Sequence, residues 1–194
     1  MLNSELAVLI IAAGNSSRLG RPKQLIPWRS TTLLGHSISC AEYITTNTYI
    51  VLGASFQEIK TQISAQNIIE FKDWEKGMGA SISFGIKQIL SQTPKLEAVL
   101  IMVCDQPYVS NDLLESLVNM HQQSNHLITA STYNQVIGVP AVFSKERFAD
   151  LLALDGNQGA RSIINKYPDE VSIVPFPEGS FDVDTPEDLT RLLH

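Results

Sequence analysis

The sequence predicts an α/β protein with a largely parallel β-sheet that is covered by helices on both faces. Three observations support this fold class. Apolar runs of strand length alternate along the chain with amphipathic stretches of helix length. The runs Leu6–Ala12 and Ala98–Val103 are apolar almost throughout, as in strands that are buried on both faces. The length of 194 residues matches one domain of about 100–200 residues, so we expect a single domain over residues 1–194.

The elements follow from these patterns in chain order. A strand is expected at each apolar run and a helix where apolar residues recur at helical spacing, as Ile82, Ile86 and Ile89 do. The expected strands are Leu6–Ala12, Thr48–Leu52, 67–71, Ala98–Val103, 127–133, 141–143 and Val171–Pro175. The expected helices are 32–44, 56–65, 80–90, 110–123, 145–154, 160–166 and Pro186–Leu193.

Composition and charge exclude several classes of protein. Hydrophobic residues make up 44% of the chain and charged residues 18%, which is typical of a globular protein. The net charge of −6 argues against a nucleic-acid partner. Cys40 and Cys104 form neither a disulfide framework nor a zinc pattern, which favours the cytoplasm. The first apolar run is too short to cross a membrane and no Lys or Arg precedes it, so we expect neither a membrane segment nor a secretory signal.

The fold class indicates where a ligand binds. In such sheets, ligands lie beyond the carboxyl ends of the strands. We therefore expect the site in the loops that follow Ala13, Leu52, Val103 and Phe143.

The loop after the first strand, AAGNSSRLGRPK at 12–23, is rich in small residues and carries the cations Arg18 and Lys23. It matches neither the dinucleotide fingerprint GxGxxG nor the phosphate loop GxxxxGK[ST]. Gly14 permits a sharp turn, and the N–H groups from Ala13 to Arg18 can form an anion-binding nest. Together with Arg18 and Lys23 this loop suits a polyphosphate; the alternative is a surface turn with two solvated cations.

Carboxylates follow the most apolar strand and precede the last helix. Asp105 lies at the end of a buried strand and needs a partner, for which Mg²⁺ is suitable. Thr185 and Asp188 are spaced as a helix-capping box. That box leaves Asp182 and Asp184 unexplained, so they are either further metal ligands or part of a solvated turn.

Two other segments have two interpretations each. Trp74 and Met78 are core residues, or the glycines beside Met78 bring the backbone close to a nucleoside. Arg161 and the N–H groups at 156–161 hold an anion, or this stretch is a plain helix start.

Residues 12–25, AAGNSSRLGRPKQL, resemble the signature loop of the nucleotidyltransferases related to the molybdenum cofactor enzymes. Further segments resemble this family in the same order: DWEKGMGAS at 73–81, CDQP at 104–107, GVPAVF at 138–143, GAR at 159–161 and DVDTPEDL at 182–189. The triplet AAG at 12–14 is the form typical of its cytidylyltransferases, whereas the guanylyltransferases tend to carry AGG. Asn157 departs from the pattern, since the family tends to have an aspartate there.

The resemblance implies a Rossmann-like three-layer sandwich that transfers CMP from CTP to the phosphate of molybdopterin cofactor, with release of pyrophosphate. Because that phosphate is largely dianionic at neutral pH, the nucleophile needs no general base. The alternatives are a GTP-dependent or other-acceptor enzyme of the same fold and a non-catalytic cofactor-delivery protein. Implied partners are CTP or another nucleoside triphosphate, molybdopterin cofactor, and a molybdenum hydroxylase or its chaperone.

The resemblance also assigns roles to individual residues. Arg18, Lys23 and Asp105 are the implied catalytic residues, and Mg²⁺ is the implied cofactor, bound by Asp105 and Asp184 with Asp182 as second choice. The implied nucleotide-binding residues are Ala12, Ala13, Gly14, Asn15, Ser16, Ser17, Arg18, Lys23, Gly53, Gly79 and Ser81. The implied second-substrate residues are Gly138, Pro140, Gly159 and Arg161.

Overall fold

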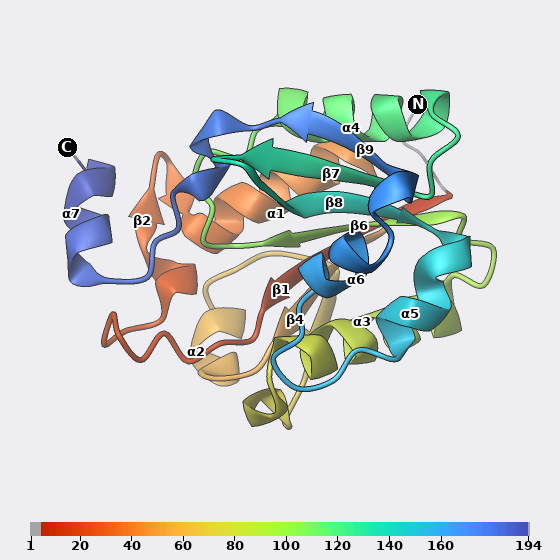
Figure 1. Cartoon of the computed structure of the whole chain (residues 1–194). Helices are drawn as coiled ribbons and strands as arrows, with labels where there is room; N and C mark the ends of the chain where they lie inside the picture. The colour runs from red at the N-terminus through yellow and green to blue at the C-terminus, as the bar shows by residue number, and fades with distance from the viewer. Residues whose placement is uncertain (1–4, 194) are drawn as a thin grey trace.

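A seven-stranded sheet forms the centre of the computed structural model, which describes residues 5–193 (Figure 1). Its strands are β1 (Leu6–Ala12), β4 (Thr48–Leu52), β5 (Asn67–Glu70), β6 (Ala98–Val103), β7 (Ile128–Tyr133), β8 (Val136–Ser144) and β9 (Val171–Pro175). Their order across the sheet is β5-β4-β1-β6-β8-β7-β9. Only β8 runs antiparallel to its neighbours among these strands, so the predicted mostly parallel sheet is confirmed.

Helices cover both faces of the sheet, as the continuous apolar strands require. On one face lie α1 (Leu33–Ile44), α2 (Phe56–Lys60) and α4 (Asn111–Gln123). On the other lie α3 (Met78–Gln92), α5 (Phe148–Leu152) and α6 (Arg161–Lys166). Successive residues of β1 alternate between the two cores: Leu9 and Ile11 pack on the α3 side, and Val8 and Ile10 on the α1 side. No helix within residues 5–193 is long and apolar enough to cross a membrane.

A third, smaller core joins the segment after β1 to the C-terminal segment. A short hairpin, β2 (Pro27–Trp28) with β3 (Thr31–Thr32), was not predicted from the sequence. Beside it lies α7 (Pro186–Leu193), and Leu19, Ile26, Leu33, Val183 and Leu192 pack together there. This packing brings the C-terminal segment onto the loop that follows β1.

Two predicted helices are wrong in extent. The helix expected at 56–65 ends at Lys60, where the Thr61 hydroxyl donates to the Glu58 carbonyl. Such side-chain bonds compete with helical ones. The helix expected at 145–154 is a 3₁₀ turn, η3 (Lys145–Arg147), followed by the five residues of α5.

The strand expected at 141–143 extends over the nine residues of β8. Gly138 and Pro140 argue against a strand in the sequence, but the pairing with β7 shifts register at this point. Ala130 pairs with Ala141 and the next residue, Ser131, pairs with Gly138, so the cis Val139–Pro140 unit is left out of the ladder. Proline is tolerated there because no N–H is needed from it.

The direction of β8 corrects one expectation about the site. Ser144, at the end of β8, pairs with Ala98, at the start of β6. The loop after Phe143 therefore lies at the opposite edge of the sheet from the loops after Ala13 and Val103. The β7–β8 turn takes its place beside those loops.

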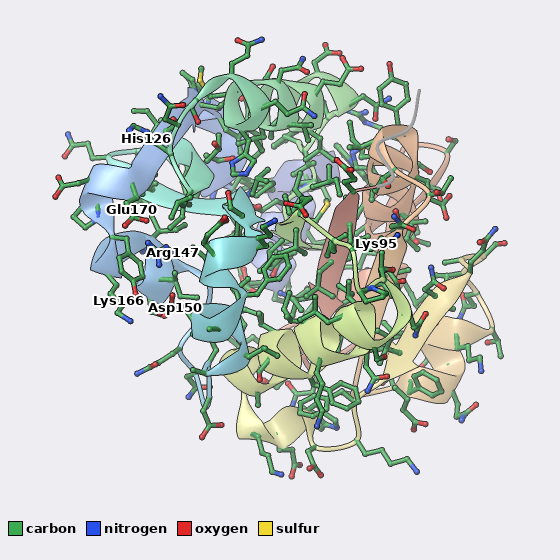
Figure 2. The ribbon with its side chains drawn as sticks, turned by 90° about the vertical axis from the view of Figure 1, so that its right-hand side faces the viewer. Lys95, His126, Arg147, Asp150, Lys166 and Glu170 are labelled. Carbon is green, nitrogen blue, oxygen red and sulfur yellow. The ribbon has the colours of Figure 1, made fainter. Side chains whose placement is uncertain are left out.

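A network of charges fixes the short helices α5 and α6 to each other (Figure 2). The Arg147 side chain is 14% exposed, forms an ion pair with Glu170 and lies 3.6 Å from the Asp150 carboxylate. Its guanidinium lies 3.8 Å from the centre of the Tyr167 ring. Lys166 lies 2.8 Å from the same Asp150 carboxylate.

Candidate functional site

A cavity of about 600 Å³ opens at the carboxyl edge of β1 and β6. Most of the residues that the sequence analysis assigned to the nucleotide and the metal line it. They are Ala12, Ala13, Gly14, Asn15, Arg18, Lys23, Ser81, Asp105, Asp182 and Asp184. Gly53, Gly79, Ser16 and Ser17 do not line it.

The loop after β1 presents unused N–H groups. Ser16 has a left-handed conformation, with φ of 52°, and a left-handed residue is one of the elements from which anion nests are built. Within residues 5–193 the N–H groups of Gly14, Asn15 and Ser16 have no acceptor. The Ser17 N–H is used, since it donates to Asn15 Oδ1 at 3.2 Å. The Ser16 hydroxyl is used as well, because it accepts from the Lys23 N–H at 3.0 Å.

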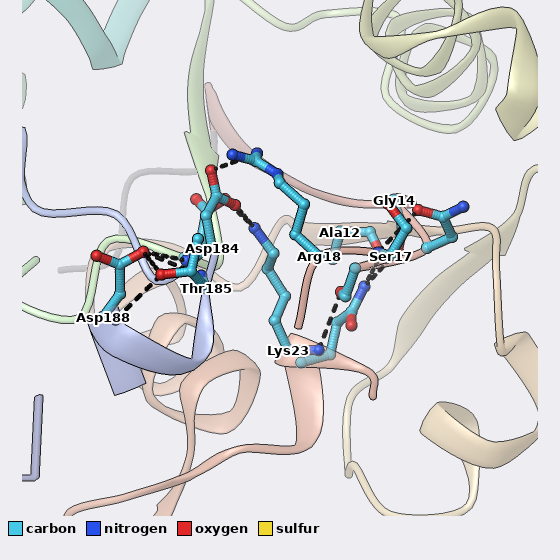
Figure 3. Close-up of polar contacts among 12 residues, drawn as sticks. Ala12, Gly14, Ser17, Arg18, Lys23, Asp184, Thr185 and Asp188 are labelled. Carbon is cyan, nitrogen blue, oxygen red and sulfur yellow. Dashed lines mark hydrogen bonds and ion pairs between the residues drawn. The ribbon is translucent and has the colours of Figure 1, made fainter. Parts of the chain in front are cut away.

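Lys23 joins the predicted acidic pair (Figure 3). Its Nζ lies 2.9 Å from Asp105 Oδ2 and also donates to Asp184 Oδ1. Arg18 Nη2 lies 2.8 Å from Asp184 Oδ2. The two acids and the two cations that the sequence analysis assigned separately therefore form one cluster.

A backbone hydrogen bond and a helix cap hold this cluster in place. The buried Val183 donates its N–H to the Asp105 carbonyl at 3.0 Å, which fixes the C-terminal segment beside the loop after β6. The predicted capping box is present: Asp188 Oδ2 accepts from the Thr185 N–H at 2.9 Å, and Thr185 Oγ1 accepts from the Asp188 N–H at 3.2 Å. Asp184 therefore lies immediately before a well-anchored helix start.

The electrostatics show a surplus of negative charge. Burial disfavours the ammonium of Lys23, but Asp105 and Asp184 outweigh it and raise its pKa above the usual range. Partial burial favours the neutral form of Asp184, but Lys23 and Arg18 outweigh it and lower the carboxyl pKa. Burial, followed by repulsion from Asp105 and Asp184, raises the pKa of Asp182 to about 6.

These residues fit a divalent cation only with help from a ligand. Carboxylate oxygens are the donors that Mg²⁺ prefers, and three carboxylates here face two cations. Within residues 5–193, however, no three acidic, His or Cys side chains are arranged to hold a metal ion. Water molecules and phosphate oxygens of a bound substrate would therefore complete the coordination of any metal at Asp105 and Asp184.

The glycines beside Met78 do approach something closely, but it is another loop of the chain. A Cβ atom on Gly79 would lie 2.6 Å from the carbonyl oxygens of Asp155 and Gln158. A Cβ atom on Gly77, whose φ is 102°, would lie 2.4 Å from the Gly156 carbonyl oxygen. The Gly79 N–H donates to that same carbonyl at 2.8 Å. Gly79 therefore packs against residues 155–158, and its assignment to the nucleotide stays a prediction.

Gly53 is explained in the same way. A Cβ atom there would lie 2.4 Å from Trp74 Cβ and 2.7 Å from the Ala13 carbonyl oxygen. The missing side chain makes room for the indole, which lines the cavity and packs against the core. Trp74 thus packs against the core, as one interpretation of the sequence expected, and the approach of a nucleoside to this segment stays a prediction.

Three of the four residues that were assigned to a second substrate lie together around one cavity. Gly138, Gly159 and Arg161 line a smaller cavity of about 120 Å³, which shares Met78 and Tyr133 with the larger one. Pro140 does not line it; its carbonyl accepts a 2.8 Å hydrogen bond from the Ser131 hydroxyl.

Sequence reasoning missed three residues of the site. Tyr133 lies between the two cavities, and its hydroxyl occupies the space in front of Gly138. Gln24 and Gln106 line the larger cavity with side chains that are 1% and 3% exposed. The signal in the sequence for these two glutamines was their place inside the family-like segments 12–25 and 104–107, next to Lys23 and Asp105.

Curated relatives support a transferase. A probable molybdenum cofactor guanylyltransferase of Bacillus mycoides is 32% identical over 124 residues, which span 63% of this chain and 58% of that protein. The purine catabolism protein PucB of Bacillus subtilis is 26% identical over 97% of this chain and 96% of its own length.

The fold is shared with solved structures. The crystal structure of Rv0371c from Mycobacterium tuberculosis matches with a TM-score of 0.84 and 27% identity, covering 100% of this chain and 99% of that one. A structure of the same protein in complex with manganese matches with a TM-score of 0.79 and 24% identity over 97% of this chain and 98% of that one. Residues 8–171, most of the chain, match the family model of the MobA-like NTP transferase domain. The chain therefore belongs to the MobA-like family of nucleotidyltransferases.

Proposed function

We propose that this nucleotidyltransferase transfers CMP from CTP to the phosphate of molybdopterin cofactor and releases pyrophosphate. One observation carries the proposal: Gly14 and Asn15, whose N–H groups have no acceptor within residues 5–193, line one cavity together with two cations and two carboxylates. The name of the Bacillus mycoides relative supports the acceptor.

The residues suit a transfer that needs no general base. An oxygen of the acceptor phosphate attacks the α-phosphorus of CTP, and the bond from that phosphorus to the β-phosphate oxygen breaks. Loop N–H groups with Arg18 and Lys23 bind the triphosphate and stabilise the negative charge of the departing pyrophosphate. Cys104 is not a nucleophile, because burial and the nearby Asp105 raise its thiol pKa to about 12.

Asp105 and Asp184 are the residues that would hold Mg²⁺, with Asp182 beside them. When bound, the ion supplies positive charge shared between the nucleotide and the incoming phosphate. The manganese complex of Rv0371c supports a divalent cation in this fold. Within the chain, Lys23 keeps both carboxylates together before any ligand arrives.

The smaller cavity is the proposed place of the second substrate. Arg161 would contact an anionic group, and the side chains of Tyr133 and Met78 fill the space in front of Gly138 and Gly159. We further propose that the enzyme works in the cytoplasm and supplies a molybdenum hydroxylase or its chaperone.

CTP is the proposed nucleotide because Ala13 is buried at the cavity wall, where a methyl group narrows the space for a base. GTP is the second candidate, favoured by the name of the guanylyltransferase relative. The test compares pyrophosphate release from CTP and GTP with molybdopterin cofactor as acceptor. A higher kcat/KM for CTP supports the proposal, whereas a higher value for GTP assigns the guanylyl reaction. Cofactor binding without pyrophosphate release from either nucleotide would indicate a delivery protein.

A further inference from the structure

Gln24 contacts the loop after β1 from beneath. Its side chain is 1% exposed, and its Nε2 donates to two carbonyls, that of Ala12 at 2.8 Å and that of Gly14 at 3.1 Å. We propose that Gln24 is a positioning residue that aims the N–H groups of this loop at the triphosphate. The inference rests on the proposed function, because it assumes that the loop binds phosphate.

The geometry of the peptide unit explains how the side chain acts at a distance. In a planar trans peptide the carbonyl and the N–H of the next residue point in opposite directions. Holding the Gly14 carbonyl against Gln24 therefore turns the Asn15 N–H away from Gln24. That N–H has no acceptor within residues 5–193, and Asn15 lines the cavity.

The same turn also carries the ammonium group. Gln24 belongs to the 3₁₀ turn η1 (Lys23–Leu25), and the Lys23 N–H donates to the Ser16 hydroxyl. Three hydrogen bonds thus connect this turn to the loop. The N–H groups and the Lys23 ammonium are thereby held in one fixed arrangement.

The carbonyl oxygen of the Gln24 side chain indicates that this residue contributes through its NH₂ group. Its Oε1 is buried and has no partner within residues 5–193. A buried acceptor without a partner is costly, and an apolar side chain of similar size such as methionine avoids that cost. Methionine cannot supply the two donated bonds, which are therefore what the amide contributes.

The first test is Gln24→Met, with binding measured by titration calorimetry at one fixed Mg²⁺ concentration. The probes are inorganic tripolyphosphate, CTP and cytidine. We expect tripolyphosphate and CTP to bind about tenfold more weakly, as for one lost interaction, and cytidine to bind as before. In turnover, KM for CTP should rise and kcat should fall as well, because the loop N–H groups bind the triphosphate and also stabilise the departing pyrophosphate.

The matched control is Thr48→Val. Thr48 is 3% exposed, and its hydroxyl donates to the Thr45 carbonyl at 3.2 Å near the opposite edge of the sheet. This change also removes a buried bond from a side chain to a carbonyl, but we expect it to leave tripolyphosphate binding unchanged. Equal losses in both variants would show a merely structural role for Gln24 and overturn the inference.

The remaining outcomes are also decisive. Parent-like tripolyphosphate affinity in Gln24→Met overturns the inference and leaves the proposed function intact. Parent protein that binds neither tripolyphosphate nor CTP overturns the proposed function itself. If Gln24→Met does not fold, Gln24→Asn retracts the donor by one methylene group, and parent-like tripolyphosphate binding in that variant overturns the inference.

Discussion

The ammonium of Lys23 lies 2.9 Å from the carboxylate of Asp105, although 82 positions of sequence separate the two residues. This contact connects the loop after β1 to the loop after β6. It also leaves Lys23 able to exchange a carboxylate for a phosphate when substrate enters, because both partners are anions.

Replacing Lys23 by alanine is expected to lower turnover sharply and leave the fold intact. Losing one preorganised charge contact to a transition state costs about 10²–10³ in rate. The check is pyrophosphate release, with circular dichroism to confirm folding. The exposed Lys95 provides the control, and Lys95→Ala should keep parent activity. Near-parent turnover in a folded Lys23→Ala protein would contradict the role of Lys23.

The acidic pair is expected to act as a unit. Asp105→Asn and Asp184→Asn should each remove most activity and weaken Mg²⁺-dependent CTP binding. The double variant should be little worse than either single one, because residues that act together are non-additive. Asp182→Asn should have a smaller effect. An Asp182 variant with the largest loss would overturn the assignment of the metal ligands.

Base choice is expected to respond to Ala13. Removing its methyl group in Ala13→Gly makes space at the cavity wall, where Ala13 is 4% exposed. We expect the ratio of kcat/KM for CTP to that for GTP to fall by about tenfold or more. Both nucleotides are measured on the same preparation, so each serves as the control for the other. An unchanged ratio would show that Ala13 does not read the base.

Stability should fall on mild acidification because of His121. Its ring bonds to Thr129 and Ser144, and burial lowers its pKa. Below the unfolded value of about 6.5, the unfolded chain binds a proton that the folded protein does not, so stability is lost as pH falls. Asp182 acts in the opposite sense, since its raised pKa lets the folded protein bind a proton first.

The contribution of His121 to the pH dependence of stability is therefore measured as the difference between the parent protein and a His121 variant. Urea unfolding of parent and His121→Gln at about pH 7.5 and about pH 5.5 isolates it. The variant should lose less stability between these two pH values than the parent. An equal or greater loss would exclude His121 as the cause.

The charge network around Arg147 should stabilise the fold. Arg147→Met removes the pairs with Glu170 and Asp150 and the stacking on Tyr167, and should cost about 1–3 kcal/mol in the free energy of unfolding. The exposed Lys95, which is labelled in the same view as Arg147 in Figure 2, provides the control. Lys95→Met should change the free energy of unfolding by no more than about 0.5 kcal/mol. Similar effects of both substitutions would show that the network contributes nothing specific.

The central strands could be predicted because each one is marked by its own run of apolar residues. β1, β4 and β6 are apolar runs that need no partner to be recognised, and the capping box of Thr185 and Asp188 is a pattern within four residues. β8 was predicted too short, because its unusual residues are accommodated only by a register shift against β7. That shift depends on pairing across the sheet, which no local pattern contains.

The residues of the site also differ in whether a local pattern indicates them. Gly14, Arg18, Lys23 and Asp105 stand out because their type and their place after a strand are visible in the chain. Gln24 could not be assigned, because its role depends on two carbonyls that lie 10 and 12 positions away. The contact of Gly79 with residues 155–158 could not be predicted either, because a glycine in the sequence indicates a close approach but not which segment approaches.

The fit of Gly77 and Gly79 against residues 155–158 restricts how this enzyme can be re-engineered. Arg161 lines the smaller cavity and Trp74 the larger one, and they belong to segments whose backbones meet where only a hydrogen atom fits. A loop graft that replaces 155–161 to change the acceptor would have to bring its matching 73–79 segment with it. Libraries aimed at new acceptors should therefore exchange the two segments as one cassette.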